Sequence, residues 1–479
     1  MSEQNFNSLS LRLYNTLTRA KEEIQPVEGK KIRMYTCGPT VYDFAHIGNF
    51  RTYVFEDLLR RTLKFFGFQV EQVMNLTDVD DKTIRGAIAK NITLDEYTKP
   101  FKEAFFKDLK TLGIESAEHY PAATDYIAEM IEMIQHLLDK GYAYIGGDGS
   151  IYYAIQKFPH YGCLSHLHLD ELKTGASERV AADEYEKENV ADFVLWKQYD
   201  QERDGQIFWE SPFGRGRPGW HLECSTMAIR LLGKTLDIHV GGIDNMFPHH
   251  ENEIAQSEAY TGKRFANLWM HSEHLIVDNK KMSKSLGNFY TLRDLLNKGY
   301  KGDQVRYLLL QTHYKTQLNF TFQGLDAAQN SLNRLNDFIS RLNEIPEKSA
   351  DNENVEAIIQ QTLYNFAAGL ADDLNISAAL AALFEFVRVI NGLCDQEKIG
   401  CNSAHKILAF LRQINTVLGV LTFEQQEDNI PEPVQNAFQA RLQARKEKNW
   451  LEADRLRDMI IHAGYCIEDT PSGARLKKL

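Results

Sequence analysis

The first third of the chain alternates between short apolar runs and amphipathic stretches. Residues 31–37 form a short apolar-rich run that stops at Gly38 and Pro39, which predicts a buried strand leading into a loop. Between about 50 and 66, apolar residues recur on one face of a helix, and residues 68–77 have the pattern of a second strand. A strand, a helix and a strand in this order predict a βαβ unit, and therefore an α/β, Rossmann-like nucleotide-binding domain.

The pattern changes several times further along the chain. After about residue 120 it mixes helical runs with short aromatic strands, a strand at LDIHV restores the α/β pattern, and everything after about 301 is helical. An acidic, Pro-containing stretch at 424–433 is typical of a linker, and it precedes a basic amphipathic helix at 434–460. We therefore expect the two halves of the α/β domain at 1–119 and 213–300, an insertion at 120–212, a helical bundle at 301–425 and a small C-terminal module at 431–479.

Composition narrows the class of protein. No stretch is apolar enough to predict a membrane span, and the N-terminus has no pattern of a secretory signal. Six cysteines without paired spacing fit a reducing compartment. We expect a cytoplasmic monomer with no membrane partner. The net charge of −12 argues against a dedicated nucleic-acid binder, although a local basic face remains compatible with it.

Two short motifs carry candidate phosphate chemistry. AHIGNFR places His46, Gly48 and Asn49 where the first helix is expected to begin, and helix N-termini attract phosphate. In an isolated HIG tripeptide, the histidine is more often only a helix cap. KMSKS supplies Lys281 and Lys284 in a polar loop, which could bind a polyphosphate or simply be solvated. The chain has no GxxxxGK[ST] motif, and the GxGxxG match at 214–219 lacks a preceding strand.

A third candidate site is dispersed along the chain. His249 and Glu253 are four residues apart and would share a helix face, whereas Cys37 and Cys224 are remote in sequence. Cys, His and carboxylate are donors that Zn²⁺ commonly combines. Spacing alone leaves buried or merely helical roles open. His250 and Glu251 are adjacent competitors that we expect on other helix faces.

The chain resembles the class I aminoacyl-tRNA synthetases, whose signatures are HIGH and KMSKS, and more narrowly the cysteinyl-tRNA synthetases. The matching blocks occur in the family's order and read TCGPTVYDFAHIGN, NLTDVDDK, GRPGWHLECS, GGIDNMFPHHENEIAQ and KMSKSLGN. The helical segment and the C-terminal module agree in length and type, so the resemblance covers essentially the whole chain. Asn49 departs from the family pattern, because the fourth residue of HIGH is histidine.

The resemblance implies a set of roles. It implies catalysis by His46, Asn49, Lys281 and Lys284, and one zinc ion per chain bound by Cys37, Cys224, His249 and Glu253. It implies ATP binding, with Mg²⁺, by Pro39, His46, Gly48, Asn49, Gly241, Gly242, Asp244 and Lys284. The cysteine pocket would be lined by Gly38, Thr77 and Trp220. The C-terminal module would bind the anticodon of tRNA(Cys), through Arg441, Arg445, Lys446, Lys448 and Trp450.

The activity implied is the ATP-dependent formation of cysteinyl-adenylate, followed by transfer of cysteine to the terminal adenosine of tRNA(Cys). Two alternatives remain at this point. One is a ligase that adenylates cysteine for a non-tRNA acceptor, and residues 431–479 argue against it. The other is a non-catalytic tRNA-binding relative, which Asn49 makes worth naming.

Overall fold

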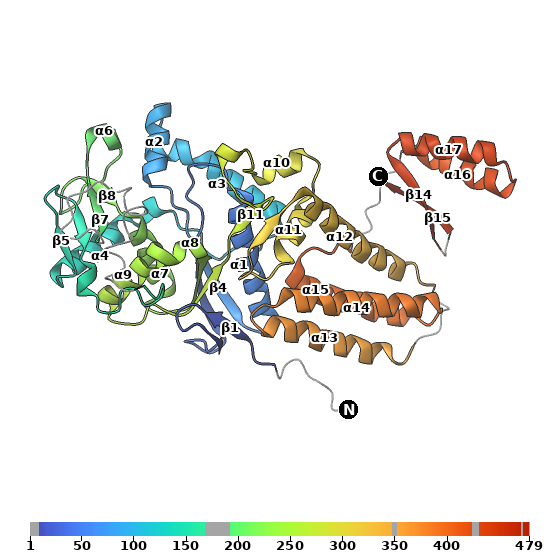
Figure 1. The fold of residues 1–479 in the computed structure, drawn as a ribbon, viewed down its shortest axis with the longest axis horizontal. Helices are drawn as coiled ribbons and strands as arrows, with labels where there is room; N and C mark the ends of the chain where they lie inside the picture. Colours follow the sequence, from blue (N-terminus) through green and yellow to red (C-terminus); the bar gives the residue numbers. More distant parts are fainter. Residues whose placement is uncertain (1–8, 168–191, 347–351, 424–430, 471–472, 479) are drawn as a thin grey trace. The chain divides into compact units, whose positions relative to one another are not determined.

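The computed structural model describes residues 9–167, 192–346, 352–423, 431–470 and 473–478 (Figure 1). The chain divides into two compact units, which we describe separately. One comprises Met1–Leu332, Asn354–Val389 and Gln413–Val420, and the other Asn333–Glu353, Ile390–Arg412 and Leu421–Leu479.

The first unit is built on a four-stranded parallel sheet in the order β10–β9–β3–β4. The bounds of its strands are Ala266–Ser272 for β10, Leu236–Gly242 for β9, Lys31–Thr36 for β3 and Gln69–Met74 for β4. Helix α1 (Ile47–Phe65) packs against this sheet, with Phe50, Val54 and Leu58 buried. Because the strands are parallel, Thr36, Met74, Gly242 and Ser272 end at the same edge. This arrangement confirms the predicted α/β fold, and ligands bind at that edge in such folds.

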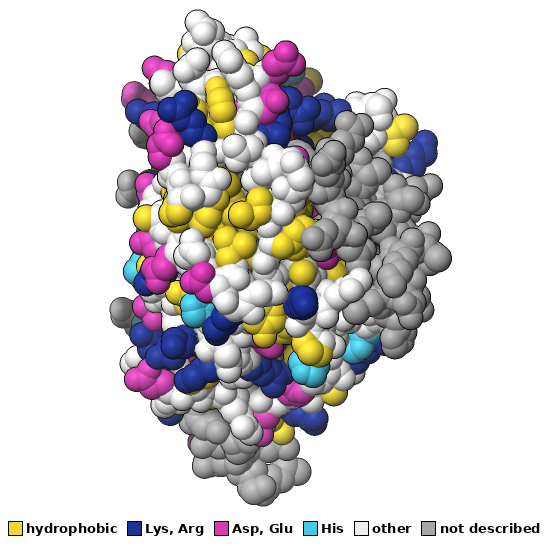
Figure 2. All heavy atoms as spheres, turned by 90° about the vertical axis from the view of Figure 1, so that its left-hand side faces the viewer, with side chains coloured by type: hydrophobic (Ala, Val, Ile, Leu, Met, Phe, Trp, Pro, Cys, Tyr) yellow, Lys and Arg dark blue, Asp and Glu magenta, His cyan; other side chains and the backbone are white. Residues whose placement is uncertain are grey.

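The region between β4 and β9 holds a second, antiparallel sheet in the order β5–β6–β7–β8. Its elements are α4 (Ile127–Asp139), β5 (Ala143–Ile145), β6 (Ile151–Tyr153), β7 (Phe193–Gln198), α6 (Gln201–Asp204) and β8 (Gly216–Pro218). Figure 2 shows this side of the molecule, where hydrophobic side chains gather between bands of Lys and Arg. Buried residues of this sheet and of the parallel sheet belong to one continuous core, which includes Trp196, Leu222 and Trp269.

Helix α7 (Trp220–Leu232) begins two residues after β8 ends, and it packs against α9 (Glu251–Thr261). The other elements that position the site are α2 (Asp81–Lys90), α3 (Leu94–Thr111), α8 (Ile243–Asn245) and the turn η4 (Met246–His250). The hairpin β1 (Arg12–Asn15) and β2 (Ala20–Glu23) contacts β10, and a small sheet contains β11 (Leu275–Val277), β12 (Lys280–Lys281) and β13 (Leu318–Phe320).

Beyond the sheets, the chain is mostly helical, as its periodicity predicts. The bounds are Lys284–Leu286 for η5, Leu292–Asn297 for α10, Gly302–Leu310 for α11, Phe322–Asn343 for α12, Val355–Ala371 for α13, Ile376–Asp395 for α14 and Cys401–Leu418 for α15. By length and composition α14 could cross a membrane, with a mean hydropathy of 1.6, so the expectation that no segment is long and apolar enough is wrong. Its side chains Leu383, Phe386 and Ile390 are buried in the protein.

The C-terminal residues form two helices and a hairpin. The bounds are Glu432–Lys446 for α16, Trp450–His462 for α17, Tyr465–Thr470 for β14 and Gly473–Lys478 for β15. The single basic helix predicted over 434–460 is therefore wrong, because Lys448 adopts a left-handed conformation with φ of 57° and the chain turns there. Val434, Phe438, Leu456, Ile460 and Tyr465 form the core of this module.

Candidate active site

His46 caps the helix that begins at the carboxyl edge of the parallel sheet. Its ring Nδ1 accepts a hydrogen bond from the Asn49 backbone N–H at 3.2 Å, and Asn49 Oδ1 accepts one from the His46 backbone N–H at 3.1 Å. Burial lowers the pKa of His46 to about 4, so the ring is neutral at pH 7. With Nδ1 accepting, the ring hydrogen lies on Nε2. His46 therefore caps the helix and keeps one N–H donor for a ligand.

The lysine-rich loop lies beside this helix start. The Ile47 backbone N–H donates to the carbonyl of Tyr290 at 3.0 Å, and a side chain at Gly48 would lie 3.1 Å from Met282 Cε. Lys284 Nζ forms an ion pair with Asp43 Oδ2 at 2.5 Å, while its side chain stays largely exposed. Lys281 is exposed on β12. The two motifs, separated by more than 200 residues of sequence, thus meet at one place.

Cys37, Cys224, His249 and Glu253 converge from four elements. Cys37 follows β3, Cys224 lies in α7, His249 lies in η4 and Glu253 lies in the first turn of α9. One donor atom from each lies within 4.8 Å of the other three, and all four side chains are buried. Fold and packing, rather than local sequence, create this cluster.

The electrostatics of the cluster leave its donors available. Burial lowers the pKa of His249, which is therefore neutral, and raises the pKa of Glu253. A hydrogen bond with Cys224, together with burial, raises the pKa of Cys37. Glu253 Oε2 lies 2.9 Å from His239 Nε2, whereas Glu253 Oε1 lies 3.0 Å from His249 Nε2 but forms no hydrogen bond with a described residue. Such a buried, unsatisfied oxygen is costly unless a ligand engages it.

Two further histidines, which the sequence did not single out as ligands, also lie in this cluster. Cys37, His239, His250 and Glu253 form a second set of donors within 4.8 Å, with His250 Nε2 at 3.2 Å from Cys37 Sγ. The expectation that His250 faces elsewhere is therefore wrong. It assumed a regular helix, whereas Phe247 has the extended values φ −136° and ψ 131°, and the helix is interrupted there. Glu251 does point away, and it accepts hydrogen bonds from the loop at 162–165.

The side chains expected around cysteine surround the same cluster. Trp220, the first residue of α7, stacks on the His249 ring with a centroid separation of 4.1 Å and is 41% exposed. Thr77 is buried after β4, and its Oγ1 accepts from Asn75 Nδ2 at 3.1 Å. Gly38 donates its N–H to Asn75 Oδ1 at 2.9 Å, and a side chain there would collide with the Asn75 carbonyl. The partly exposed ring of Trp220 therefore lies beside the buried donor atoms.

The residues expected to bind the nucleotide line the neighbouring strand ends. Pro39 follows Cys37 and Gly38, and its carbonyl accepts from the Thr77 N–H at 3.1 Å. Gly241 and Gly242 end β9, and Asp244 follows in α8. A side chain at Gly241 would lie 2.8 Å from His250 Cε1, so this glycine also makes room for the cluster.

The five residues expected to contact tRNA belong to the second unit. Arg445 and Lys446 end α16, Lys448 lies in the turn and Trp450 begins α17, and all four are exposed. Arg441 is half-buried on α16. The side chain of Trp450 is 59% exposed, so its ring is open to stacking.

Comparison with known families assigns three segments of the chain. A model described as tRNA synthetases class I (C) catalytic domain matches residues 23–330. A DALR domain matches residues 365–422, and a cysteinyl-tRNA ligase anticodon binding domain matches residues 427–475.

Curated relatives match over the whole length. The cysteine–tRNA ligase of Protochlamydia amoebophila is 69% identical over 478 residues, covering 100% of both chains. That of Chlamydia felis is 56% identical over 480 residues, again covering 100% of both chains.

Solved structures show the fold. The methionyl-tRNA synthetase of Mycobacterium tuberculosis bound by methionyl-adenylate aligns with a TM-score of 0.58 at 14% identity, covering 82% of this chain and 89% of that one. A LeuRS–tRNA–LeuAMS complex of Agrobacterium radiobacter aligns with a TM-score of 0.59 at 13% identity, covering 83% and 85%.

Proposed function

The chain belongs to the cysteine–tRNA ligases, class I aminoacyl-tRNA synthetases that join cysteine to tRNA, and from this we propose that its buried cluster binds the zinc ion that selects cysteine. The observation that carries the proposal is the convergence of two thiols, an imidazole and a carboxylate within 4.8 Å. The match of the anticodon binding domain at 427–475 argues against a non-tRNA acceptor.

The donor set suits zinc. Zn²⁺ accepts thiolate, imidazole and carboxylate together, and its ligating histidine must be neutral, as His249 is. Glu253 Oε1 would gain the partner it lacks, while His239 holds the other oxygen. His221 Nδ1 lies 2.8 Å from His249 Nδ1, which leaves His249 Nε2 turned toward Glu253. Cys37, Cys224, His249 and Glu253 would hold the ion, and the set with His239 and His250 is the alternative.

A zinc ion here would supply a bond to the substrate thiolate, which serine and alanine cannot match. Discrimination by shape alone is worth only about 1–3 kcal/mol for so small a difference in the substrate. Trp220 would close the amino-acid site beside His249, and Thr77 would line its wall. The site then needs no separate editing step.

The residues at the helix start would handle the phosphates. His46 Nε2–H would donate to a phosphate oxygen without carrying a charge, and Lys284 would exchange Asp43 for the triphosphate of Mg²⁺–ATP. Lys281 and Asn49 would contribute from the loop and from the helix, with Gly48 leaving room for the base. Gly241, Gly242 and Asp244 would contact adenosine, and Pro39 and Gly38 would face the bound substrates. Arg441, Arg445, Lys446, Lys448 and Trp450 would contact the anticodon.

We also propose the domain division that the sequence suggests. Segments 1–119 and 213–300 would form the catalytic domain, 120–212 its insertion, 301–425 the helical bundle and 431–479 the anticodon-binding module. The matched ranges 23–330, 365–422 and 427–475 support it.

Zinc content of purified variants tests the metal site. Cys224→Ala should lose the metal, because one of four donors is removed, whereas the matched control Cys163→Ala should keep one zinc per chain, since Cys163 lies outside both donor sets. Equal zinc in the two proteins would exclude the assignment. Cysteine-dependent exchange of pyrophosphate into ATP, with no exchange for serine or alanine, then tests the proposed selection of the thiol.

A further inference from the structure

Glu223 is buried beside the proposed cysteine pocket, and none of the roles assigned above uses it. It lies in the first turn of α7, three residues after Trp220 and directly before Cys224. Side chains three and four residues apart lie on one face of a helix, so Glu223 shares with Trp220 the face of α7 that borders the pocket. Helix α7 also packs against β3 and β4, after which Cys37 and Thr77 follow in the chain.

The carboxylate of Glu223 is buried without a hydrogen-bond partner among the described residues. Its exposed fraction is 0%, and neither of its oxygens accepts a hydrogen bond there. Burial raises the pKa of Glu223 well above its usual value, and the hydroxyl of Thr77, which lies beside the carboxylate, only partly opposes this rise. Such a group destabilises the fold unless a ligand supplies the partner.

Thr77 connects Glu223 to the amino-acid pocket. Its backbone N–H donates to the carbonyl of Pro39 at 3.1 Å, which fixes Thr77 beside the loop that follows Cys37. Thr77 Oγ1 accepts a hydrogen bond from Asn75 Nδ2 at 3.1 Å. Because that bond uses a lone pair, the hydroxyl hydrogen is left to donate, and a second lone pair is left to accept.

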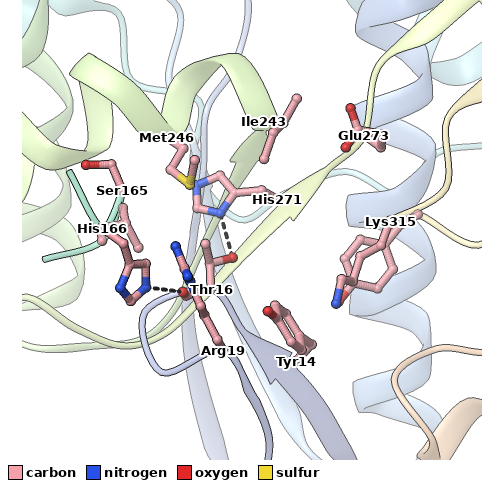
Figure 3. Close-up of a pocket in the computed structure, with 12 residues that line it drawn as sticks. Tyr14, Thr16, Arg19, Ser165, His166, Ile243, Met246, His271, Glu273 and Lys315 are labelled. Carbon is pink, nitrogen blue, oxygen red and sulfur yellow. Dashed lines mark hydrogen bonds between the residues drawn. The ribbon is translucent and has the colours of Figure 1, made fainter. Parts of the chain in front are cut away.

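Three other acidic side chains of this region are engaged elsewhere. Asp78 Oδ2 pairs with Lys102 Nζ at 2.7 Å, and Glu253 belongs to the donor cluster. Glu273 lines another cavity, of about 230 Å³, whose lining includes none of the residues expected around cysteine (Figure 3). This leaves Glu223 as the carboxylate available at the wall of the cysteine pocket.

A metal that binds a thiolate does not by itself define cysteine as the substrate. Zinc binds the thiolate of any small thiol that reaches it, so selection of an amino acid requires contact with another group. The carboxylate of cysteine must face the phosphate that it attacks, which leaves the α-ammonium group for the wall of the pocket. Hydrogen bonds between an ammonium group and a carboxylate are about twice as strong as neutral ones.

We propose that Glu223, together with the Thr77 hydroxyl, receives the α-ammonium group of the bound cysteine and so restricts the site to thiols that are amino acids. The inference rests on the proposed function, because it adds a second point of recognition to the same pocket. It predicts that Glu223 contributes to the affinity for cysteine and contributes neither to metal binding nor to the affinity for ATP.

A comparison of two ligands isolates this contact. 3-Mercaptopropionate keeps the thiol and the carboxylate of cysteine and lacks only the amino group. In Glu223→Gln, which keeps the size of the side chain, the affinity for cysteine should fall at least about tenfold, because a charge-assisted hydrogen bond is lost. The inhibition constant of 3-mercaptopropionate in pyrophosphate exchange should stay within about twofold, since this ligand never makes the contact.

Two further variants complete the experiment. Glu223→Asp keeps the charge and should retain part of the preference for cysteine over 3-mercaptopropionate. Glu56→Gln changes a carboxylate of α1 that is equally buried and equally without a partner among the described residues, so it is the matched control and should alter neither constant. All three variants should keep the zinc content and the KM for ATP of the unchanged protein.

The remaining outcomes are distinct. Equal losses of affinity for cysteine and for 3-mercaptopropionate in Glu223→Gln would indicate a distorted pocket and would overturn the inference. Unchanged affinity for cysteine would overturn it as well, and loss of zinc would assign Glu223 to the metal site instead. Absence of cysteine-dependent pyrophosphate exchange in the unchanged protein would refute the proposed function itself.

Discussion

At the scale of single residues, the start of α1 explains how Asn49 can stand where the family pattern has histidine. Asn49 Oδ1 accepts from the His46 backbone, and His46 Nδ1 accepts from the Asn49 backbone, so the two side chains close a reciprocal cap. The Asn49 backbone N–H thereby fixes the tautomer that leaves His46 Nε2–H free, and the Asn49 side chain completes the cap. Its own amide group can still donate to a ligand.

Exchange of Asn49 tests this account. Asn49→His should change the rate of adenylate formation by less than about tenfold, or 1.4 kcal/mol, because histidine can also accept and donate there. Asn49→Ala removes both functions and should cost more than tenfold, together with roughly 1 kcal/mol of stability from the lost cap. Pyrophosphate exchange and thermal unfolding measure the two effects separately. An alanine variant as active as asparagine would leave this side chain without a catalytic role.

Lys284 forms an exposed ion pair with Asp43, and a phosphate could take the place of this carboxylate. Lys284→Ala should lower the rate constant of adenylation by about 10² to 10³, as for removal of one charge-stabilising donor, with little change in cysteine affinity. Lys280→Ala, at an exposed lysine of the preceding strand β12, is the matched control and should stay near full activity. If both variants kept the full rate constant, Lys284 would have no part in the chemistry.

Most residues of this site can be identified from sequence motifs, and the remaining ones are brought there by the packing of the fold. The family blocks locate Cys37, Cys224, His249 and Glu253, and the structure brings them together. His239 and His250 could not be predicted as members of the site, for two different reasons. His239 sits in a buried strand whose apolar pattern marks only core, and His250 turns inward because the chain is irregular at Phe247. The pairing of Asn49 with His46 depends on cap geometry that a motif does not encode.

At the scale of elements, an ion-pair network ties the insertion to α2. Asp81, in the first turn of α2, pairs with Arg217 of β8 and with Lys197 of β7, and Arg217 also lies 3.4 Å from Asp204. Burial opposes it, but Arg217 and Lys197 hold the pKa of Asp81 below its usual value. Arg217 is three residues before Trp220, so the network fixes the strand that delivers Trp220 to His249.

Asp81→Asn should therefore act on the cysteine pocket from a distance. Removal of the carboxylate leaves the buried Arg217 and Lys197 with less compensation, so the melting temperature should fall. KM for cysteine should rise several-fold as Trp220 loses its placement, while KM for ATP stays unchanged. Asp95→Asn, the same change in the first turn of α3, should alter neither constant. A rise in both constants for Asp81→Asn would point to general loosening and would contradict a role in positioning Trp220.

Helices and strands were predictable where the hydrophobic period agreed with the residues that begin and end each element. The strand at 31–36 and the helix that follows it appear where the pattern places them. The helix predicted across 434–460 failed at Lys448, because a new helix begins directly after it: the Asn449 side chain caps α17 by accepting a hydrogen bond from the Glu452 backbone N–H at 3.3 Å. An Asn followed three residues later by Glu is a local N-cap signal that the hydrophobic period alone does not register.

At the scale of the whole molecule, an acidic chain can still act on RNA because its basic groups are local. The net charge is −12, yet Arg445, Lys446 and Lys448 gather around exposed Trp450 in a module with its own core. The residues proposed for adenylation all lie in the other unit. Binding of the tRNA and activation of cysteine should therefore be separable.

Deletion of residues 431–479 tests this separation. The core of α16, α17 and β14 is made by residues of that segment, so its loss should leave the parallel sheet and the buried cluster folded. Cysteine-dependent pyrophosphate exchange should stay within about threefold of the full chain. Charging of tRNA should fall by at least 10², because each stacked base alone contributes about 1–3 kcal/mol to binding. Trp450→Ala in the full chain should reproduce part of the charging defect, whereas Leu451→Ala, at the neighbouring and still more exposed position, should not. A truncated protein that charged tRNA as well as the full chain would refute the anticodon role, and one that lost pyrophosphate exchange as well would show that the module supports the catalytic fold.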